Sequence, residues 1–356
     1  MLDRQYELLG PDTEGDPASL GRKVRFLSRP DSYTPAPETV TVRETHMSWV
    51  FMAGDRVYKL KKSVRFPYLD FSTLERRAGA CMAEVSLNRR LAPDVYLGVA
   101  PLTITPAGYS IGGDGRVTDW LVVMRRLDEN ETLEARLKAQ KVSRAEVERL
   151  ANNLLQFYTH TSRVMINPES YAVSLQRAAV VDRQILLNPA FELNRGTIER
   201  IFNVQRRFLQ QHRKILAERV HHRFIVDSHG DLRPEHIWLS DSFPIIDCLE
   251  FNARLRTLDP LDEVAFLHLE CERLGGRWVG EAVRRRLAVS LEDDPASALF
   301  PFYRINRAML RARLSIAHLI DPHPRTPEKW PWLTRAYLAL ARADAGELER
   351  LLPCQA

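Results

Sequence analysis

The feature that most constrains the fold is a change of hydrophobic period along the chain. Up to about residue 127 the apolar residues mostly fall in short strand-like runs, and beyond it they recur mainly at helical intervals. The short runs follow one another closely, which indicates an antiparallel meander rather than strand–helix–strand units. We therefore predict an α+β fold with two lobes: an antiparallel β-rich N-terminal lobe with one main helix, and a mainly helical C-terminal lobe.

The predicted N-terminal lobe covers residues 23–127 and follows a lead-in segment, residues 1–22, that is rich in Asp, Gly and Pro. Strands are expected in VRFLS, ETVTVRETH, SWVFMA and RVYKLKK. A helix capped by Ser72 is expected in STLERRAGACMAEVSLNRRLA. Strands return in VYLGVAPLTIT, GYSIGG and DWLVVMRRL.

The predicted C-terminal lobe covers residues 128–356. Ser143 followed by Glu146 is typical of a capped helix N-terminus, and a long periodic segment runs from about Gly196 to Val220. Two short strand candidates, HIWLS and PIIDCLEF, interrupt the helices.

Charge and cysteine usage limit the class of protein. The 51 Lys and Arg residues against 46 Asp and Glu give a net charge of +5, but the dispersed charge weighs against nucleic acid as a partner. The four cysteines form no closely spaced pair, so we expect reduced thiols and a cytoplasmic protein. No window approaches the ~20 apolar residues that a membrane span needs.

The stretch HGDLRPEHI, residues 229–237, places Asp231 in a loop that leads into a strand candidate. A carboxylate in such a loop can approach a substrate hydroxyl; the alternative is an aspartate that caps a turn. Phosphoryl transfer needs such a carboxylate, together with metal ligands and a cation for the phosphates.

Asp247 follows the apolar run FPII, where an isolated carboxylate is costly unless it is paired or bound to a metal. We interpret it as a metal ligand; a partner for a nearby arginine is the alternative. Glu250 could add a second oxygen ligand, although strand spacing would turn it away from Asp247 unless the strand ends before it.

Lys59 in RVYKLKK shares a strand face with Lys61, and three clustered lysines are more often a solvated edge than a phosphate clamp. A helix carboxylate paired with one of them would change that interpretation. Glu84 in the following helix could supply it; the alternative is a surface ion pair with Arg77.

In their order along the chain, these motifs resemble the aminoglycoside phosphotransferase and choline kinase superfamily, which has a protein-kinase-like fold. ETHMSWVF, VYKLKKSVRFPYLDFSTLERR, LNRRLAPDVYLGV and IDCLEFNARLRTLDPLDE look more narrowly like an uncharacterised bacterial branch of it. The resemblance covers about residues 38–275.

The resemblance implies an ATP-dependent kinase that uses Mg²⁺ and phosphorylates a small molecule. Lys59 would hold the α- and β-phosphates and pair with Glu84, Asp231 would be the catalytic aspartate, and Asp247 would bind Mg²⁺. The main chain at Arg125 and Leu127 would be the hinge that binds adenine.

Two departures from the superfamily pattern stand out. The loop THMS, which ends at Ser48, lacks GxGxxG, so phosphate cover would depend on its main-chain N–H groups. His236 stands where an asparagine metal ligand is usual, and imidazole suits Mn²⁺ better than Mg²⁺. An altered metal preference and a nucleotide-binding pseudokinase with a regulatory or scaffold role therefore both stay open.

Arg304, Arg307 and Arg311 recur at i, i+3 and i+7, so a helix would stack them on one face. Such a stripe favours contact with an anionic substrate group, whereas a solvated helix face is the alternative. The sequence leaves the identity of the acceptor and the oligomeric state open.

Overall fold

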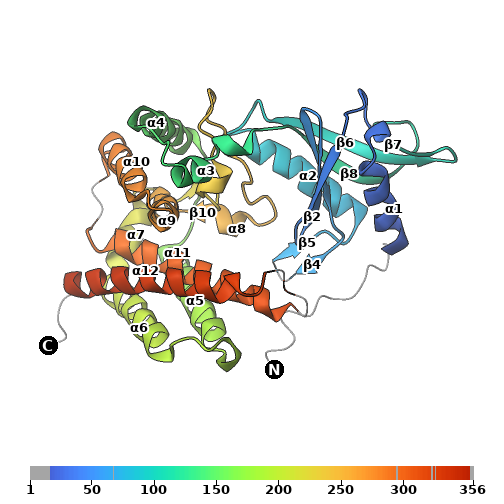
Figure 1. The fold of residues 1–356 in the computed structure, drawn as a ribbon. Helices are drawn as coiled ribbons and strands as arrows, with labels where there is room; N and C mark the ends of the chain where they lie inside the picture. The colour runs from blue at the N-terminus through green and yellow to red at the C-terminus, as the bar shows by residue number, and fades with distance from the viewer. Residues whose placement is uncertain (1–16, 67, 294–295, 322–323, 325, 353–356) are drawn as a thin grey trace. The chain divides into compact units, whose positions relative to one another are not determined.

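The computed structural model describes residues 17–66, 68–293, 296–321, 324 and 326–352 (Figure 1). It confirms the predicted α+β fold and divides the chain into two compact units. The first unit comprises residues 1–132 and 236–255, and the second comprises residues 133–235 and 256–356. The predicted division at residue 128 therefore needs a correction, because the segment 236–255 belongs with the β-rich unit.

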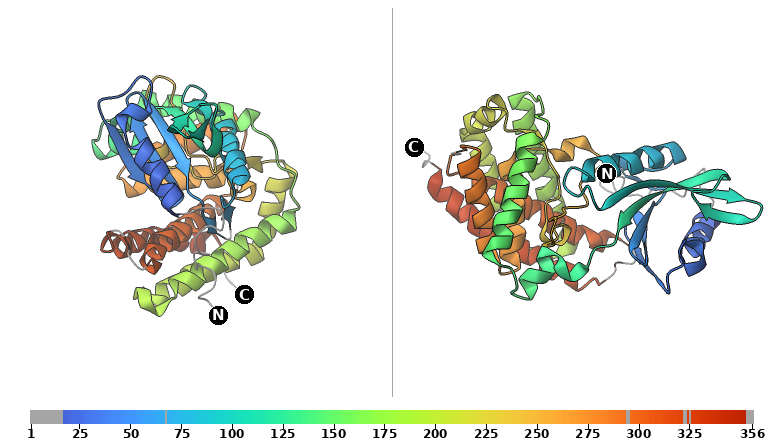
Figure 2. Two further views of the ribbon diagram at one scale, coloured as in Figure 1. Left: turned by 90° about the vertical axis from the view of Figure 1, so that its right-hand side faces the viewer. Right: turned by 90° about the horizontal axis from the view of Figure 1, so that it is seen from above.

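The first unit is built on a six-stranded antiparallel sheet in the order β1-β2-β3-β8-β6-β7. The strands are β1 Val40–Glu44, β2 Ser48–Ala53, β3 Arg56–Lys61, β6 Tyr96–Thr105, β7 Gly108–Ile111 and β8 Arg116–Arg125. Gly54, at a φ of 62°, makes the turn between β2 and β3, a conformation that suits glycine. The sheet is curved, as the two views of Figure 2 show.

The two faces of the sheet are covered by different helices. On one face, α1 (Pro17–Leu27) packs its Leu27 with Phe51, Tyr58 and Leu60 of the strands. On the other face, α2 (Leu74–Asn88) packs against β6 and β8 (Figure 1). Because strand side chains alternate, Lys59 and Lys61 lie on the α2 face.

Two local predictions for the first unit are wrong. The run VRFLS lies largely in α1 rather than in a strand, because Leu20, Val24 and Leu27 recur at helical spacing and cover the sheet. The N-cap of α2 is Thr73 rather than Ser72, since the Thr73 side chain accepts a hydrogen bond from the Arg76 N–H. The short strands β4 (Arg65–Phe66) and β5 (Leu69–Asp70) form a separate hairpin before α2.

The second unit is mainly helical, as predicted. Its helices are α3 Leu133–Lys138, α4 Arg144–His160, α5 Pro168–Leu186, α6 Arg195–Gln211, α7 Arg213–His221, α9 Pro260–Arg273, α10 Arg277–Ser290, α11 Leu299–Ala317 and α12 Lys329–Leu351. The capping box of Ser143 and Glu146 is present, whereas the predicted long helix is divided into α6 and α7 at His212. A two-stranded sheet pairs β9 (Val226–Asp227) with β10 (Thr257–Leu258).

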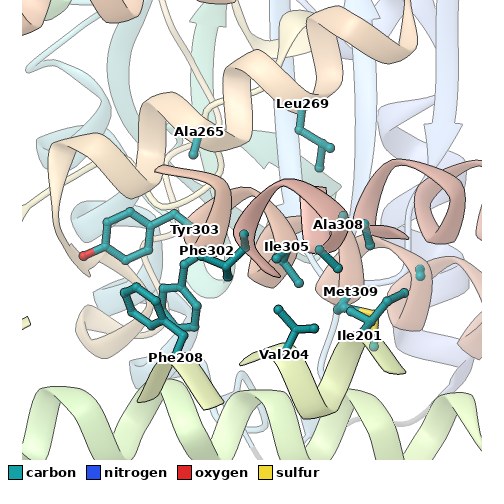
Figure 3. Packing of buried hydrophobic residues seen from close by; sticks show 14 of the residues in the cluster. Ile201, Val204, Phe208, Ala265, Leu269, Phe302, Tyr303, Ile305, Ala308 and Met309 are labelled. Atoms are coloured by element: carbon teal, nitrogen blue, oxygen red, sulfur yellow. The ribbon is translucent and has the colours of Figure 1, made fainter. Parts of the chain in front are cut away.

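The core of the second unit is formed by α11, which packs along α12, α9, α5 and α6. Figure 3 shows Phe208 of α6 against Phe302 of α11, whose ring centroids lie 4.0 Å apart. Ala265 and Leu269 of α9 line the same core. Every residue of α9 from Pro260 to Cys271 is buried, so its acidic side chains must find partners inside the protein.

The segment 236–255 does not form the two predicted strands. HIWLS and PIIDCLEF contribute only isolated antiparallel bridges, between Ile237 and Ile245 and between Trp238 and Thr132, and Ile246 N–H donates to the His236 carbonyl. No helix within the described ranges is apolar over a stretch long enough to span a bilayer.

Candidate functional site

Two lysines on the α2 face of β3 share one buried carboxylate. Lys59 Nζ lies 2.9 Å from Glu84 Oε1, and Lys61 Nζ lies 2.5 Å from Glu84 Oε2. The side chains of Lys61 and Glu84 are each only 1% exposed. The lysines are therefore not a solvated edge, and the pairing of Lys59 with Glu84 that the resemblance implies is present.

Each lysine also holds a carboxylate of the segment after residue 246. Lys59 Nζ lies 3.1 Å from Asp247 Oδ1, and Lys61 Nζ lies 2.6 Å from Glu250 Oε1. Asp247 has a φ of 61°, which ends the extended path of the chain and lets both carboxylates reach the same sheet face. The extended path thus ends before Glu250, which is the case in which Glu250 was not expected to turn away.

The charges in this cluster stabilise one another. Burial lowers the pKa of Lys59, but Asp247, Glu84 and Glu250 more than offset it and hold that pKa well above its usual value. Burial raises the pKa of Glu84, yet Lys59 and Lys61 together bring it below its usual value. Both lysines are thus cationic and Glu84 is ionised at neutral pH.

The main chain around Asp247 is fixed by hydrogen bonds within the first unit. Four consecutive N–H groups, from Ile245 to Cys248, each donate to an acceptor outside these four residues. The acceptors are, in order, Leu91 O at 3.3 Å, His236 O at 3.0 Å, Tyr96 Oη at 3.3 Å and Asn88 Oδ1 at 2.9 Å. A left-handed aspartate persists only where its surroundings over-determine it, and such positions concentrate at functional sites.

A surface pocket of about 550 Å³ opens in the first unit. Its lining residues are Thr41, Arg43, Met52, Asp55, Arg126, Leu127, Asp128, Glu129 and Asn130. Arg43 and Lys59 both lie directly opposite Val50 in the sheet, so the pocket and the lysines share a face.

Leu127, one of the two predicted hinge residues, lines this pocket. Arg125 N–H donates to Val95 O, and Arg126 N–H donates to Asp55 O at 2.7 Å. No described residue accepts a hydrogen bond from Leu127 N–H. Two main-chain hydrogen bonds therefore anchor the chain just before a donor that a ligand in the pocket could use.

The loop before β2 is closed by its own residues. Ser48 is 2% exposed, and its N–H donates to Thr45 Oγ1 at 2.9 Å. Thr45 N–H donates back to Ser48 O. Ser48 thus shapes this turn, with its own N–H already bonded.

His236 ends the short 3₁₀ turn Pro234–His236 and is 9% exposed. Its carbonyl is paired with Ile246, which brings the His236 main chain next to the Asp247 segment. Within the described part of the chain, no three His, Cys, Asp or Glu side chains gather as a metal-binding group. Of the predicted metal ligands, Asp247 has the most accessible side chain, 46% exposed, against 10% for Glu250.

In the second unit, Asp231 lies in a loop held by a buried carboxylate. Gly230 has a φ of 90°, which requires glycine, and its N–H donates to Glu263 Oε1 at 2.5 Å. His229 N–H and Tyr158 Oη also donate to Glu263, which is fully buried. Burial raises the pKa of Glu263, although these three donors act in the opposite direction.

Asp231 also has cationic neighbours that sequence reasoning missed. Arg233 Nη2 lies 2.9 Å from Asp231 Oδ2, and Arg233 Nη1 lies 2.6 Å from Glu235 Oε1. Asp231 acts on Arg311 as well, since it helps the other acidic groups raise the pKa of that guanidinium against burial. The sequence signal that could have predicted this ion pair is the position of Arg233, two residues after Asp231.

The three arginines of α11 are not a solvated face. Arg304 is 5% exposed and bonds both oxygens of Asp344, and Arg307 is 7% exposed and bonds both oxygens of Asp262. Arg311 donates to Glu270 Oε1 at 2.8 Å. The three arginines on one face of α11 are therefore bound to acidic partners in the same unit.

Comparisons with known proteins give relatives of two kinds. No protein-family model matches the chain. Uncharacterised proteins of Mycobacterium bovis and Mycobacterium tuberculosis are 32% identical to it over 288 residues, which is 80% of this chain and 56% of theirs. The chain thus spans little more than half the length of these relatives.

Solved structures share the fold. A choline/ethanolamine kinase family protein from Mesorhizobium loti matches with a TM-score of 0.54 at 14% identity, covering 93% of this chain and 97% of that one. Choline kinase from Cryptosporidium parvum matches with a TM-score of 0.52 at 9% identity, covering 94% and 98%. The predicted resemblance to the choline kinase superfamily is confirmed at the level of the fold.

Proposed function

We propose that this chain transfers the γ-phosphoryl group of ATP to a hydroxyl group of a small molecule. The observation that carries the proposal is Lys59, whose ammonium group lies within 3.1 Å of both Glu84 and Asp247 on the sheet face that borders the pocket. Phosphoryl transfer depends on positioning and charge, and this cluster offers a fixed cation beside an accessible carboxylate. The fold shared with choline kinases supports the same reaction class.

The first unit would supply the nucleotide half of the site. The pocket is large enough for a nucleobase, Met52 gives it an apolar wall, and Leu127 N–H and the Arg125 carbonyl would bind the base edge. Lys59 would hold the α- and β-phosphates. Ser48 would contribute by shaping the turn over the phosphates, since its own N–H is engaged.

Asp247 is the residue that best fits a metal ion, because its carboxylate is accessible and hard cations favour oxygen ligands. A bound Mg²⁺ would neutralise charge on the β- and γ-phosphates. His236 is retained as a proposed second ligand that would favour Mn²⁺. Glu250, also predicted as a ligand, has a weaker claim because Lys61 already binds its carboxylate.

The second unit would supply Asp231, which would accept a hydrogen bond from the acceptor hydroxyl and orient it. Glu263 would fix the loop, and Arg233 would hold the carboxylate in place. Of the three α11 arginines, Arg311 retains the best claim to an anionic acceptor, since it lies within electrostatic range of Asp231. To bind one, Arg304 would have to give up its bonds to Asp344, and Arg307 its bidentate pair with Asp262.

We also propose where the protein acts and what it binds. Cys81, Cys248 and Cys271 are buried free thiols, which supports the proposal of a reducing, cytoplasmic setting. The proposed partner is a small-molecule acceptor rather than nucleic acid or a membrane.

The proposal is tested by incubating the protein with labelled ATP, Mg²⁺ or Mn²⁺ and a metabolite extract, beside its Asp231→Asn and Asp231→Ala variants. We expect transfer to a small molecule by the wild type and its loss in both variants, with nucleotide-induced thermal stabilisation retained. Equal transfer by all three proteins would remove Asp231 from the mechanism.

A second candidate function, a nucleotide-binding pseudokinase, is favoured by His236. The His236→Asn variant separates the two. Higher Mg²⁺-dependent turnover in the variant than in the wild type would favour a kinase whose metal preference is tuned by the histidine. Nucleotide binding without turnover in either protein would favour the pseudokinase.

A further inference from the structure

We propose that Lys61 is a positioning residue: it keeps Glu84 neutralised and anchors Glu250, and so holds the Asp247 segment in place while Lys59 engages a nucleotide. The role of Lys59 in this inference rests on the proposed function. The anchoring of the segment by Lys61 does not.

The first argument concerns Glu84, whose two carboxylate oxygens serve different lysines. If Lys59 turned toward a phosphate and no other cation were present, Glu84 would be left as an unpaired charge inside the protein. Such a charge is strongly destabilising. Lys61, at 2.5 Å, keeps the carboxylate paired, so Lys59 can change partners without that penalty.

The second argument concerns the strained backbone at Asp247. The main-chain hydrogen bonds described above fix the segment from Ile245 to Cys248. Beyond them, the bond of 2.6 Å between Lys61 and Glu250 ties the following residues to β3. Asp247 is thus held from both sides, as a left-handed aspartate requires.

The third argument is that Lys61 cannot itself act as a ligand. Its side chain is 1% exposed, and its ammonium group lies 4.9 Å from the centroid of the Phe71 ring. A group so enclosed acts through Glu84 and Glu250. Glu250, predicted as a metal ligand, thereby becomes an anchor.

The first unit offers a matched control. Lys23 is likewise a buried lysine whose Nζ lies 2.7 Å from a buried carboxylate, that of Asp119. Asp119 keeps a second cation, Arg77, at 2.8 Å, as Glu84 keeps Lys59. Lys23→Met therefore removes a comparable ion pair from the same unit without touching Asp247.

The experiment compares Lys61→Met, Lys61→Arg and Lys23→Met in the full chain. Hydrogen exchange of peptides covering residues 245–251 reports the anchoring, and binding of ATP with Mg²⁺ or Mn²⁺ reports its consequence. We expect Lys61→Met to accelerate exchange in that segment and to weaken metal–ATP binding by about tenfold or more, the equivalent of losing about one charged hydrogen bond. Lys23→Met should change neither, and Lys61→Arg should restore most of the binding.

Equal effects of Lys61→Met and Lys23→Met on exchange and binding would overturn the inference. If Lys61→Met does not fold, Glu250→Gln removes the anchor while Glu84 keeps Lys61. Faster exchange at 245–251 in Glu250→Gln would support the inference, and unchanged exchange would overturn it.

The two readouts distinguish this inference from the proposed function. A wild-type protein that binds no metal–nucleotide pair would refute the proposed function, while selective release of residues 245–251 in Lys61→Met would still support the anchor. Wild-type binding combined with exchange that is the same in all variants would leave the function intact and refute the anchor.

Discussion

Each unit contains a buried ionic network, and the two networks differ in how completely their charges are enclosed. In the second unit, Arg307 and Asp262 are joined by bonds of 2.8 and 2.9 Å, and both side chains are almost wholly buried. In the first unit, Lys59 is shared between Glu84 and an Asp247 side chain that is 46% exposed. The network of the second unit is therefore closed on itself, whereas that of the first unit leaves a carboxylate at the surface.

This difference in enclosure distinguishes charged groups that stabilise the fold from those that can bind a ligand. A bidentate pair in the interior is out of reach of a ligand in solvent, and breaking it exposes the full desolvation penalty. A lysine with two carboxylates, one of them accessible and carried on a left-handed backbone, can exchange partners at lower cost. Dense buried charge is therefore a poor guide to a site unless part of it reaches the surface.

The largest expected effect comes from opening the closed network with Arg307→Met. The substitution leaves Asp262 buried without its partner, and burial already raises the pKa of that carboxyl. We expect the free energy of unfolding to fall by about 3–5 kcal/mol, measured by urea denaturation. Arg213→Met, which breaks an exposed pair with Glu169, is the control and should cause a much smaller loss. Equal losses would show that burial does not distinguish the two pairs.

The next effect is a pH dependence at a buried histidine of the second unit, beside Arg304. His268 is 1% exposed; burial and then Arg304 lower its pKa to about 4, against the opposing effects of Glu281 and Glu272. Because the folded-state pKa is below the unfolded value near 6.5, the contribution to stability is present above pH ~6.5 and is lost as pH falls toward 4.

His268→Gln should remove this contribution. Between pH 7 and pH 4 the wild type should lose about 2–3 kcal/mol more unfolding free energy than the variant. Urea denaturation of both proteins at each pH measures the difference, and common effects of other carboxyl groups cancel. Parallel pH curves would contradict the lowered pKa.

These networks also show where sequence reasoning succeeds. The helical spacing of Arg304, Arg307 and Arg311 correctly predicts a single face, because periodicity is local. Their burial was not predicted, because it depends on acidic residues such as Asp262 and Glu270 in another helix. Long-range partners are not encoded in local spacing.

The first unit teaches the same lesson. The antiparallel meander of β1, β2 and β3 could be predicted from the pattern, and the pairing of Lys59 with Glu84 from the resemblance. The reach of Glu250 stayed open, because it depends on whether the strand ends at Asp247, which takes a φ of 61°. The role of Lys61 could not be predicted either, because its burial depends on α2 and on the segment 236–255, which lies far along the chain.

The open network should respond differently to an equivalent substitution. Lys59→Met leaves Glu84 paired with Lys61 and Asp247 partly in water, so we expect unfolding free energy to fall by only about 1–2 kcal/mol. The variant should also lose the stabilisation by metal–ATP, about 2.7 kcal/mol in the wild type at a hundredfold excess over Kd. Thermal and urea denaturation with and without ligand measure both. A loss as large as that of Arg307→Met would mean that this network is closed as well.

The smallest effect tests whether geometry or burial gives the closed pairs their strength. Arg43 and Glu129, on the wall of the pocket, form a bidentate pair with bonds of 2.5 and 2.9 Å, yet their side chains are 57% and 56% exposed. The coupling energy of this pair is measured with Arg43→Ala, Glu129→Ala and the double variant. If burial determines the strength of a pair, this energy should be about 0.2–1 kcal/mol and should shrink as salt is raised. A coupling of about 3 kcal/mol that persists in salt would instead assign the strength of the Arg307 pair to its bidentate geometry. The distinction between the two networks would then depend on how their donors are shared rather than on their access to water.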